Sequence, residues 1–335
     1  MAEAGQTSAR EMGIVGLGRM GGSLARQALS KGLRVVGFTR SGVREELVRE
    51  GVVAAKTLEE LPRELQRPRA VFLYVRAGPP VDEVLERLAS VLEPEDVVVD
   101  GGNSYWGDSI RRAERLAERG LRFVDVGTSG GISGARHGAC FMAGGEDAAV
   151  ARVEPLLRAL AVPGGFVHAG RSGTGHFTKL VHNGIEFAML QAIGEGVALL
   201  ESYGERLPVA NILGCWRNGS VIRSWLIELM HEQYASMGDL EQVPSHVEDT
   251  GEVSWLVSDA MQREVPIPLI THALMQLFQS RDTEQLAARA VALMRRAFGE
   301  HPLGHAPSVV EGRRTGRVGD IVEAHSLDEQ PSASE

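Results

Sequence analysis

The chain has 335 residues, 43% of them hydrophobic and 24% charged, which is the composition of a globular protein large enough for two domains. Its 35 basic and 44 acidic residues give a formal net charge of −9, which argues against a broad surface for nucleic acid or for an anionic membrane. We interpret the two cysteines, Cys140 and Cys215, as small buried residues rather than a disulfide framework or a thiolate metal site. The N-terminal MAEAGQTSAR lacks the features of an export signal, and no apolar run could span a bilayer, so we expect a cytoplasmic protein.

Short β-branched runs alternate with amphipathic stretches from residue 12 to about residue 126. The runs are GIVG, RVVGF, AVFLYV, DVVVD and RFVDV, and the stretches between them include VDEVLERLASVL and DSIRRAERLAERG. This alternation predicts βαβ units in a Rossmann-like, doubly wound α/β domain, whose ligands bind at the carboxyl ends of the parallel strands. A more irregular portion follows, with ACFMAGG, AAVARVEPLLRAL and GGFVHAG, and we expect it to complete the same sheet.

Helical periodicity without strand-like alternation dominates from about residue 175, so the second domain is predicted to be all-α. The two prolines of REVPIPLI mark a point where one helix ends and another begins. We therefore expect a disordered N-terminus over residues 1–11, a dinucleotide-binding domain over 12–174, an all-α domain over 175–305 and a flexible tail over 306–335.

The segment GIVGLGRMGGSLA carries three glycines in the GxGxxG spacing, directly after a predicted strand and at the start of a predicted helix. Such glycines permit a tight turn, the approach of a diphosphate to the backbone and close packing of helix on strand, while the helix N-terminus offers unpaired amides. The alternative is a merely structural glycine turn. We predict a dinucleotide-binding loop formed by Gly16, Leu17, Gly18, Arg19, Met20 and Gly21.

The next predicted strand ends in GFTRSG, without the acidic residue that usually accepts a hydrogen bond from the ribose 2′-hydroxyl of NAD. Thr39, Arg40 and Ser41 offer hydroxyls and a guanidinium suited to a 2′-phosphate, so NADP is favoured over NAD. The alternative for Arg40 is a solvated surface arginine.

Two further loops follow the predicted strands AVFLYV and DVVVD. The first contains Val75, Arg76 and Ala77, which we expect to line the cofactor site. The second is DGGNSYW, in which the amide of Asn103 could bridge nicotinamide and substrate, although an asparagine in a glycine-rich turn can also be only a turn former.

The stretch GHFTKLVHNGIEF places unusual polar chemistry on a largely apolar helix. At 100° per residue, four polar side chains project from one face: Lys179, His182, Asn183 and Glu186. The apolar residues elsewhere on the helix are expected to pack in a core: Leu180, Val181, Ile185 and Met189. The alternative is an ordinary solvated polar face.

A lysine that is partly desolvated beside a cationic nicotinamide has its ammonium form disfavoured, so a neutral Lys179 could act as a base. Glu186 could then return a proton as an acid. These residues predict proton transfer combined with hydride transfer, but they do not identify the substrate.

Four motifs resemble, in order and spacing, the decarboxylating 6-phosphogluconate dehydrogenase family. They are GLGRMG, DGGNS, SGG at residues 129–131 followed by GARHGACFMAGG, and GHFTKLVHNGIE. The similarity covers residues 12 to 305, and the length resembles the short type of the family. The wider β-hydroxyacid dehydrogenase superfamily shares the GxGxxG, SGG and lysine helix, but not KLVHNGIE.

The resemblance implies oxidation of 6-phospho-D-gluconate at C3, then decarboxylation to ribulose 5-phosphate, a step of the pentose phosphate pathway. Lys179 would take the proton from the C3 hydroxyl and later donate one to the ketone oxygen, Glu186 would protonate C1 of the enediol, and Asn183 would assist as a third catalytic residue. Residues implied to hold the sugar acid are Asn103, Ser129, Gly130, Gly131, His182 and Asn183. The resemblance also implies a homodimer or homotetramer formed through the all-α domain, and nothing in the sequence demands a metal ion.

The phosphate site departs from the family pattern. Phe187 stands where the long type has a phosphate-binding tyrosine, and the long type's lysine-bearing loop has no counterpart in QVPSHVEDTGEVSW. Arg281 matches a phosphate-binding arginine, with a surface arginine as the alternative, and His301 is a further candidate from the partner chain. Two other functions remain open from sequence: a non-decarboxylating β-hydroxyacid dehydrogenase and a non-catalytic dinucleotide-binding protein.

Overall fold

A computed structural model describes residues 10–203, 205–300 and 302–307. Over these residues the chain separates into two compact units: the first comprises residues up to 184 together with 251–263, and the second comprises 185–250 and the residues from 264 onward. The predicted disorder of residues 1–9 and the predicted flexibility of residues 308–335 lie outside the described ranges. The first strand begins at Glu11, one residue before the predicted start of the first domain.

The first unit contains a doubly wound sheet, as predicted. Over the described residues it has eight strands in the order β3-β2-β1-β4-β5-β6-β7-β8. Only the β6–β7 pairing is antiparallel, and β7 and β8 extend the same sheet, as expected from the irregular portion. The strands are β1 (Glu11–Val15), β2 (Arg34–Phe38), β3 (Val53–Ala54), β4 (Ala70–Leu73), β5 (Val97–Asp100), β6 (Arg122–Ser129), β7 (Ala139–Gly145) and β8 (Ala161–Gly170).

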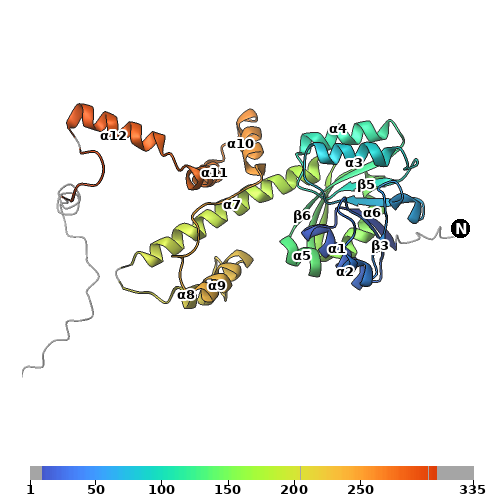
Figure 1. The fold of residues 1–335 in the computed structure, drawn as a ribbon, viewed down its shortest axis with the longest axis horizontal. Helices are drawn as coiled ribbons and strands as arrows, with labels where there is room; N and C mark the ends of the chain where they lie inside the picture. Colours follow the sequence, from blue (N-terminus) through green and yellow to red (C-terminus); the bar gives the residue numbers. More distant parts are fainter. Residues whose placement is uncertain (1–9, 204, 301, 308–335) are drawn as a thin grey trace, which may run out of the picture. The chain divides into compact units, whose positions relative to one another are not determined.

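Helices cover both faces of this sheet (Figure 1). Alternate strand residues enter two different cores: Ile14 and Phe72 belong to one, while Val15 and Leu73 belong to the other. Burial on both faces explains why the strands read as nearly continuous β-branched runs. One face is covered by α1 (Arg19–Ser30), α2 (Glu45–Arg49), α5 (Gly131–His137) and α6 (Asp147–Leu160), and the other by η1 (Leu61–Glu64), α3 (Pro79–Ala89) and α4 (Trp106–Ala117).

Helix α7 (Thr174–Glu201) begins in the first unit and continues into the second. Helix α10 (Glu252–Gln262) also belongs to the first unit, although it comes from the segment predicted to be a separate all-α domain. The buried Asp259 of α10 accepts hydrogen bonds from the Tyr105 hydroxyl and the Trp106 indole. The compact units therefore do not divide at the predicted boundary between residues 174 and 175.

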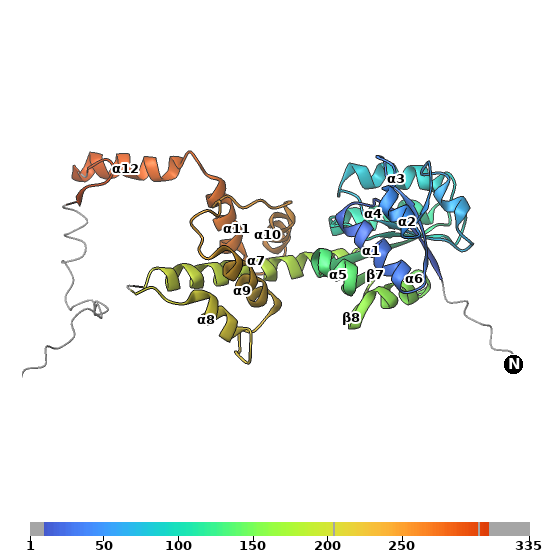
Figure 2. The ribbon, with the colours of Figure 1, turned by 60° about the horizontal axis from the view of Figure 1, so that its bottom comes forward.

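The second unit is helical over its described residues, as predicted, and α8 and α9 pack side by side in it (Figure 2). Its helices, besides the end of α7, are α8 (Val209–Trp216), α9 (Trp225–Met237), α11 (Pro268–Arg281) and α12 (Leu286–Gly299). The break at REVPIPLI is confirmed, because α10 ends at Gln262 and α11 begins at Pro268.

The expected burial of the apolar residues of α7 is only partly confirmed. Leu180 is buried, but the prediction for Ile185 and Met189 is wrong for the single chain, where they are 52% and 40% exposed. The interpretation of the cysteines as buried is also wrong, since Cys140 and Cys215 are both exposed thiols.

Candidate active site

The glycine-rich loop joins β1 to α1 and fits a dinucleotide diphosphate. Gly16 has a φ of +95°, and a Cβ there would lie 2.4 Å from the Tyr74 carbonyl oxygen; a Cβ on Gly21 would lie 2.0 Å from the Gly16 oxygen. Gly18, by contrast, faces open space at the N-cap of α1, where no side chain caps the helix and no acidic residue occupies the first turn. The first amides of α1 are thus available for an anion.

The other residues of this loop contribute in different ways. The Leu17 side chain is buried and lies where a Cβ on Gly37 would clash with it, so only its backbone can face a ligand. Met20 packs against the core beneath the loop, and Arg19 is exposed.

The turn after β2 carries the residues that were expected to choose the cofactor. Arg40 and Ser41 are exposed, Thr39 is half-buried, and the Thr39 carbonyl accepts from the Gly42 amide. The Arg40 guanidinium donates to Glu83 at 2.6 Å, an ion pair in which both side chains are more than half exposed. The arginine is therefore held at the end of the strand but remains accessible from solvent.

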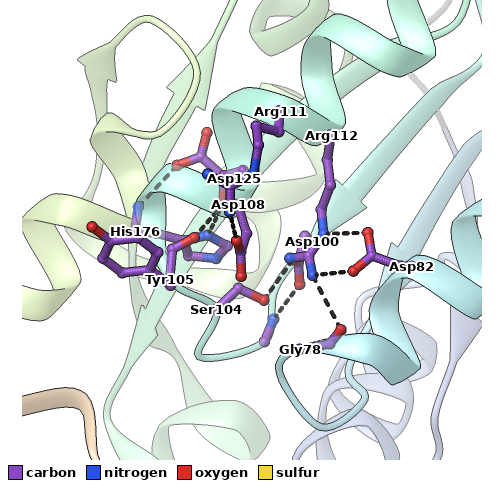
Figure 3. Close-up of polar contacts among 12 residues, drawn as sticks. Gly78, Asp82, Asp100, Ser104, Tyr105, Asp108, Arg111, Arg112, Asp125 and His176 are labelled. Atoms are coloured by element: carbon purple, nitrogen blue, oxygen red, sulfur yellow. Dashed lines mark hydrogen bonds and ion pairs between the residues drawn. The ribbon is translucent and has the colours of Figure 1, made fainter. Parts of the chain in front are cut away.

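A buried ionic network fixes the loops after β4 and β5 (Figure 3). The Asp100 carboxylate accepts from the Gly102 amide at 3.1 Å and the Ser104 hydroxyl at 2.7 Å, which closes the turn around Asn103. The Arg112 guanidinium lies 3.5 Å from Asp100 and donates to both carboxylate oxygens of Asp82 at 3.0 Å.

The same guanidinium donates to the Gly78 carbonyl at 3.1 Å, at the end of the loop that contains Val75, Arg76 and Ala77. Arg112 thus ties that loop to the one bearing Asn103. The hydrogen bond from Arg112 also holds the pKa of Asp82 below its ordinary value, although burial opposes the shift.

Asn103 is oriented by a residue far away in the chain. Its side-chain amide donates to the carboxylate of Glu252 on α10, 149 residues later in the sequence. Asn103 is exposed and Glu252 is buried, so the contact holds the amide nitrogen of the asparagine against α10.

The end of β6 meets the polar face of α7. The Lys179 amine donates to the Asn183 carbonyl oxygen at 2.5 Å and lies 3.4 Å from His182 Nδ1. His182 Nε2 lies 2.9 Å from the Ser129 hydroxyl. Gly130 and Gly131, both with positive φ, turn the chain from β6 into α5 beside this cluster. The structure therefore brings together four of the expected site residues: Ser129, Lys179, His182 and Asn183.

Two expected site residues belong to the second unit, namely Glu186 on α7 and Arg281 at the end of α11. The Arg281 guanidinium donates to Asp249 at 2.9 Å and lies 3.5 Å from Glu248. An incoming phosphate would compete with these two carboxylates for the same fork of N–H groups. His301 lies outside the described residues.

Two family models match the chain in succession. Residues 11–170 match the NAD binding domain of 6-phosphogluconate dehydrogenase, and residues 175–285 and 201–311 match the C-terminal domain of 6-phosphogluconate dehydrogenase. The chain belongs to the 6-phosphogluconate dehydrogenase family. The resemblance seen in the sequence motifs is thereby confirmed, and the chain is an enzyme of an oxidoreductase family.

Individual members of the 6-phosphogluconate dehydrogenase family support this assignment. The chain is 39% identical over 294 residues to the NAD(+)-dependent, decarboxylating enzyme of Haloferax volcanii, with 87% of this chain and 97% of the relative covered. It is 36% identical over 290 residues to the decarboxylating enzyme of Schizosaccharomyces pombe, covering 80% of this chain and 58% of that relative. The short type of the family is thus the better match in length.

A solved structure of a 6-phosphogluconate dehydrogenase has the same fold. The enzyme of Plasmodium falciparum, described free, with NADP+ and with 6-phosphogluconate, superposes with a TM-score of 0.75 at 28% identity. The superposition covers 89% of this chain and 66% of that one.

Several residues around this 6-phosphogluconate dehydrogenase site were missed by the sequence reasoning. Glu252 and Asp259 act through contacts that span about half the chain, and no local pattern marks them. Asp125 carries a signal that could have been read, because it is a lone carboxylate within the apolar strand run RFVDV. Burial raises the pKa of Asp125 and also raises the pKa of Tyr74, below the glycine loop, to about 12.

Among the described residues, no group of three or more histidine, cysteine, aspartate or glutamate side chains could hold a metal ion. None of the helices described is both long and apolar enough to cross a membrane.

Proposed function

We propose that this chain oxidises 6-phospho-D-gluconate at C3 with reduction of NADP and decarboxylates the product to ribulose 5-phosphate, as in the pentose phosphate pathway. The observation that carries the proposal is the Lys179–Asn183–His182–Ser129 cluster at the end of β6. It is supported by relatives named as decarboxylating enzymes and by the substrate named for the Plasmodium falciparum structure.

When bound, the oxidised nicotinamide would supply the acceptor for a hydride from C3. Lys179 accepts the proton of the C3 hydroxyl in the same step, because its amine is held by Asn183 in the cluster. His182 contacts both the Lys179 amine and the Ser129 hydroxyl, so it links that amine to the end of β6. The pre-set orientation is what a base needs to act on one hydroxyl among several.

Loss of carbon dioxide then needs only a proton donor. The ketone at C3 is β to the carboxylate, and protonated Lys179 donates to the ketone oxygen as the C1–C2 bond breaks. Glu186, farther along α7, then protonates C1 of the enediol, the carbon that was C2 of the sugar acid, while the now neutral Lys179 takes back the hydroxyl proton and the ketone of ribulose 5-phosphate forms. Asn103, Ser129, Gly130 and Gly131 bind the hydroxyls and carboxylate of the sugar acid, and Arg281 binds its phosphate.

The preference for NADP is argued from this chain, since the Haloferax volcanii relative is named NAD(+)-dependent. No carboxylate occurs in the turn at residues 39–41, and Arg40 presents an accessible guanidinium there. Arg40 with Thr39 and Ser41 would bind the 2′-phosphate. We place this chemistry in the cytoplasm, in a homodimer or homotetramer assembled through the second unit.

The direct test is an assay of purified protein with 6-phosphogluconate and NADP, following reduced cofactor by absorbance and released carbon dioxide together. The proposal requires equal amounts of both. Cofactor reduction without gas would favour a non-decarboxylating β-hydroxyacid dehydrogenase instead, and cofactor binding without reduction would favour a non-catalytic dinucleotide-binding protein.

A further inference from the structure

Strand β6 presents three alternate residues, which share one face of the strand, to the start of α7. Successive strand residues point to opposite faces, so Asp125, Gly127 and Ser129 share a face while Val124 and Val126 enter the opposite core. Each of the three contacts a different part of α7: Asp125 the His176 amide, Gly127 the backbone near Lys179, and Ser129 the His182 side chain. We call Asp125, Gly127 and Ser129 the docking face of β6.

Asp125 caps α7 from outside the helix (Figure 3). Its two carboxylate oxygens accept from the Gly173 amide at 2.6 Å and from the His176 amide at 2.9 Å. The first turn of α7 contains no acidic residue of its own, and its amides carry the positive end of the helix dipole. The Asp125 carboxyl is fully buried, and desolvation raises its pKa, whereas the hydrogen bonds from the Gly173 and His176 amides oppose that shift.

Gly127 sets how closely the helix approaches the strand. A Cβ on Gly127 would lie 2.4 Å from the Cβ of Lys179 and 3.0 Å from the Gly175 carbonyl oxygen. A Cβ on Gly175 would in turn lie 2.4 Å from the Asp125 carbonyl oxygen. The two backbones are therefore in contact at the level of Lys179, and no side chain can fit between them.

The third contact completes the alignment, because Ser129 meets His182, which in turn contacts Lys179. His176, next to the capped amide, is also anchored sideways: its Nδ1 lies 2.7 Å from the Ser109 hydroxyl of α4. The start of α7 is thus fixed along its axis by Asp125, in depth by Gly127 and in rotation by Ser129.

We propose that Asp125 is a positioning residue for Lys179: by capping α7 it fixes the axial position of the Lys179–His182–Asn183 cluster relative to Ser129 on β6. The inference rests on the proposed function in taking Lys179 as the base. Asp125 has no need to touch substrate or cofactor, since it acts through the helix.

The test compares Asp125→Asn and Asp125→Ala with Asp96→Asn. Asp96, just before β5, is an equally buried carboxylate that accepts two backbone amides, from Arg69 at 2.8 Å and Glu93 at 3.0 Å, and is also paired with the Arg69 guanidinium. None of its side-chain hydrogen bonds among the described residues involves α7. All variants are assayed with 6-phosphogluconate for kcat, KM and the pH profile of kcat, and for the NADP dissociation constant.

The proposal predicts that kcat falls on the order of 10-fold to 100-fold in Asp125→Asn and further in Asp125→Ala, because asparagine retains one acceptor. NADP affinity changes less than about twofold, since α1 and its loop are untouched, and the acid limb of the kcat profile moves. Asp96→Asn lowers the melting temperature but leaves kcat and its pH profile as in the wild type. A folded Asp125→Asn protein with wild-type kcat and pH profile overturns the proposal.

A second measurement keeps the test independent of the substrate. The chain has only three lysines, Lys31, Lys56 and Lys179, and the first two are exposed. Protein labelled with [ε-13C]lysine therefore gives one site signal and two internal references. The Lys179 signal should titrate differently from wild type in Asp125→Asn and in Gly127→Ala, which displaces the helix sterically, but not in Asp96→Asn.

The two readouts separate the two possible failures. A wild-type enzyme that is inactive on 6-phosphogluconate refutes the proposed function. Even then, a Lys179 signal that titrates differently in Asp125→Asn than in the wild type still supports the positioning role. An unchanged Lys179 titration in both Asp125→Asn and Gly127→Ala refutes the positioning role, whatever the substrate.

Discussion

Arg40 decides the cofactor if the 2′-phosphate binds at the end of β2. Its guanidinium is 73% exposed and paired with Glu83, so a phosphate can take over its N–H groups without moving the backbone. Loss of a hydrogen bond to a charged group costs about 1.5–3 kcal/mol. Arg40→Ala should therefore weaken NADP on the order of tenfold to 100-fold and change NAD affinity less than about twofold, as measured by fluorescence titration.

Glu83→Gln is the matched control for Arg40→Ala. It removes the carboxylate that pairs with Arg40 but keeps the arginine, so NADP affinity should be unchanged or stronger. Equal weakening of NADP and NAD by Arg40→Ala would contradict the assignment of Arg40 to the 2′-phosphate.

At the residue scale the sequence could predict what depends on local periodicity. Helical geometry placed Lys179, His182 and Asn183 on one face, and their side chains do meet. Periodicity could not place Ser129 beside them, and only the family resemblance put it in the same site. Periodicity also could not show that Glu252 orients Asn103, because both contacts depend on how separate elements pack.

Helix α4 organises the loops at the carboxyl edge of the sheet. Arg112 is 2% exposed and lies between the fully buried Asp100 and the half-exposed Asp82. Removing one partner of a buried ion pair leaves an uncompensated charge, at a cost of about 3–5 kcal/mol. Arg112→Leu should lower the free energy of unfolding by that amount in urea denaturation, and weaken cofactor binding because both loops lose their anchor.

The pH dependence of this effect has a definite sign. The Asp82 pKa is lowered in the folded state, so its pairing with Arg112 stabilises the fold above the ordinary aspartate pKa and is lost as pH falls through the folded pKa. The stability difference between wild type and Arg112→Leu should shrink as the pH is lowered below about 4. Arg111→Leu, at an exposed neighbour paired only with Asp108 among the contacts described, is the control and should cost less than about 0.5 kcal/mol.

At the element scale, strands and helices of the first unit were predicted well because their burial differs. Strands buried on both faces read as continuous β-branched runs, and helices buried on one face read as amphipathic stretches. The run Val97–Val99 illustrates this, since a short β-branched run between two aspartates favours a strand buried on both faces, and it forms β5. Helix α10 shows the limit: its own periodicity is helical, but its docking onto the first unit depends on the side chains of Glu252 and Asp259 reaching residues about 150 positions earlier.

The second unit leaves large apolar side chains exposed in the single chain. They include Ile185, Leu199, Leu269, Leu293 and Met294, which are 52%, 74%, 78%, 64% and 57% exposed. So many exposed apolar residues on helices is unusual for a monomer and typical of a surface covered by a second copy. The same argument explains why periodicity alone misplaced Ile185 and Met189 in a core of the single chain.

Sedimentation velocity should therefore show two or four chains per particle at micromolar concentration. Leu293→Glu places a charge on the exposed apolar face of α12 and should shift the particle toward the monomer. Val48→Glu, at an exposed valine on α2 of the first unit, is the control and should leave the assembly unchanged. A wild-type chain that sediments as a monomer would contradict the assembly proposed for the second unit.

The measurement that tests the central claim most directly is the turnover of Lys179→Met with 6-phosphogluconate and NADP, beside its affinity for NADPH. Removal of the base should lower kcat on the order of 100-fold to 10,000-fold and leave NADPH affinity nearly intact, because the side chain acts on the substrate hydroxyl. Lys31→Met and Lys56→Met make the same change at the two exposed lysines and should retain full activity. Retention of most of the wild-type kcat by Lys179→Met would contradict the assignment of the base.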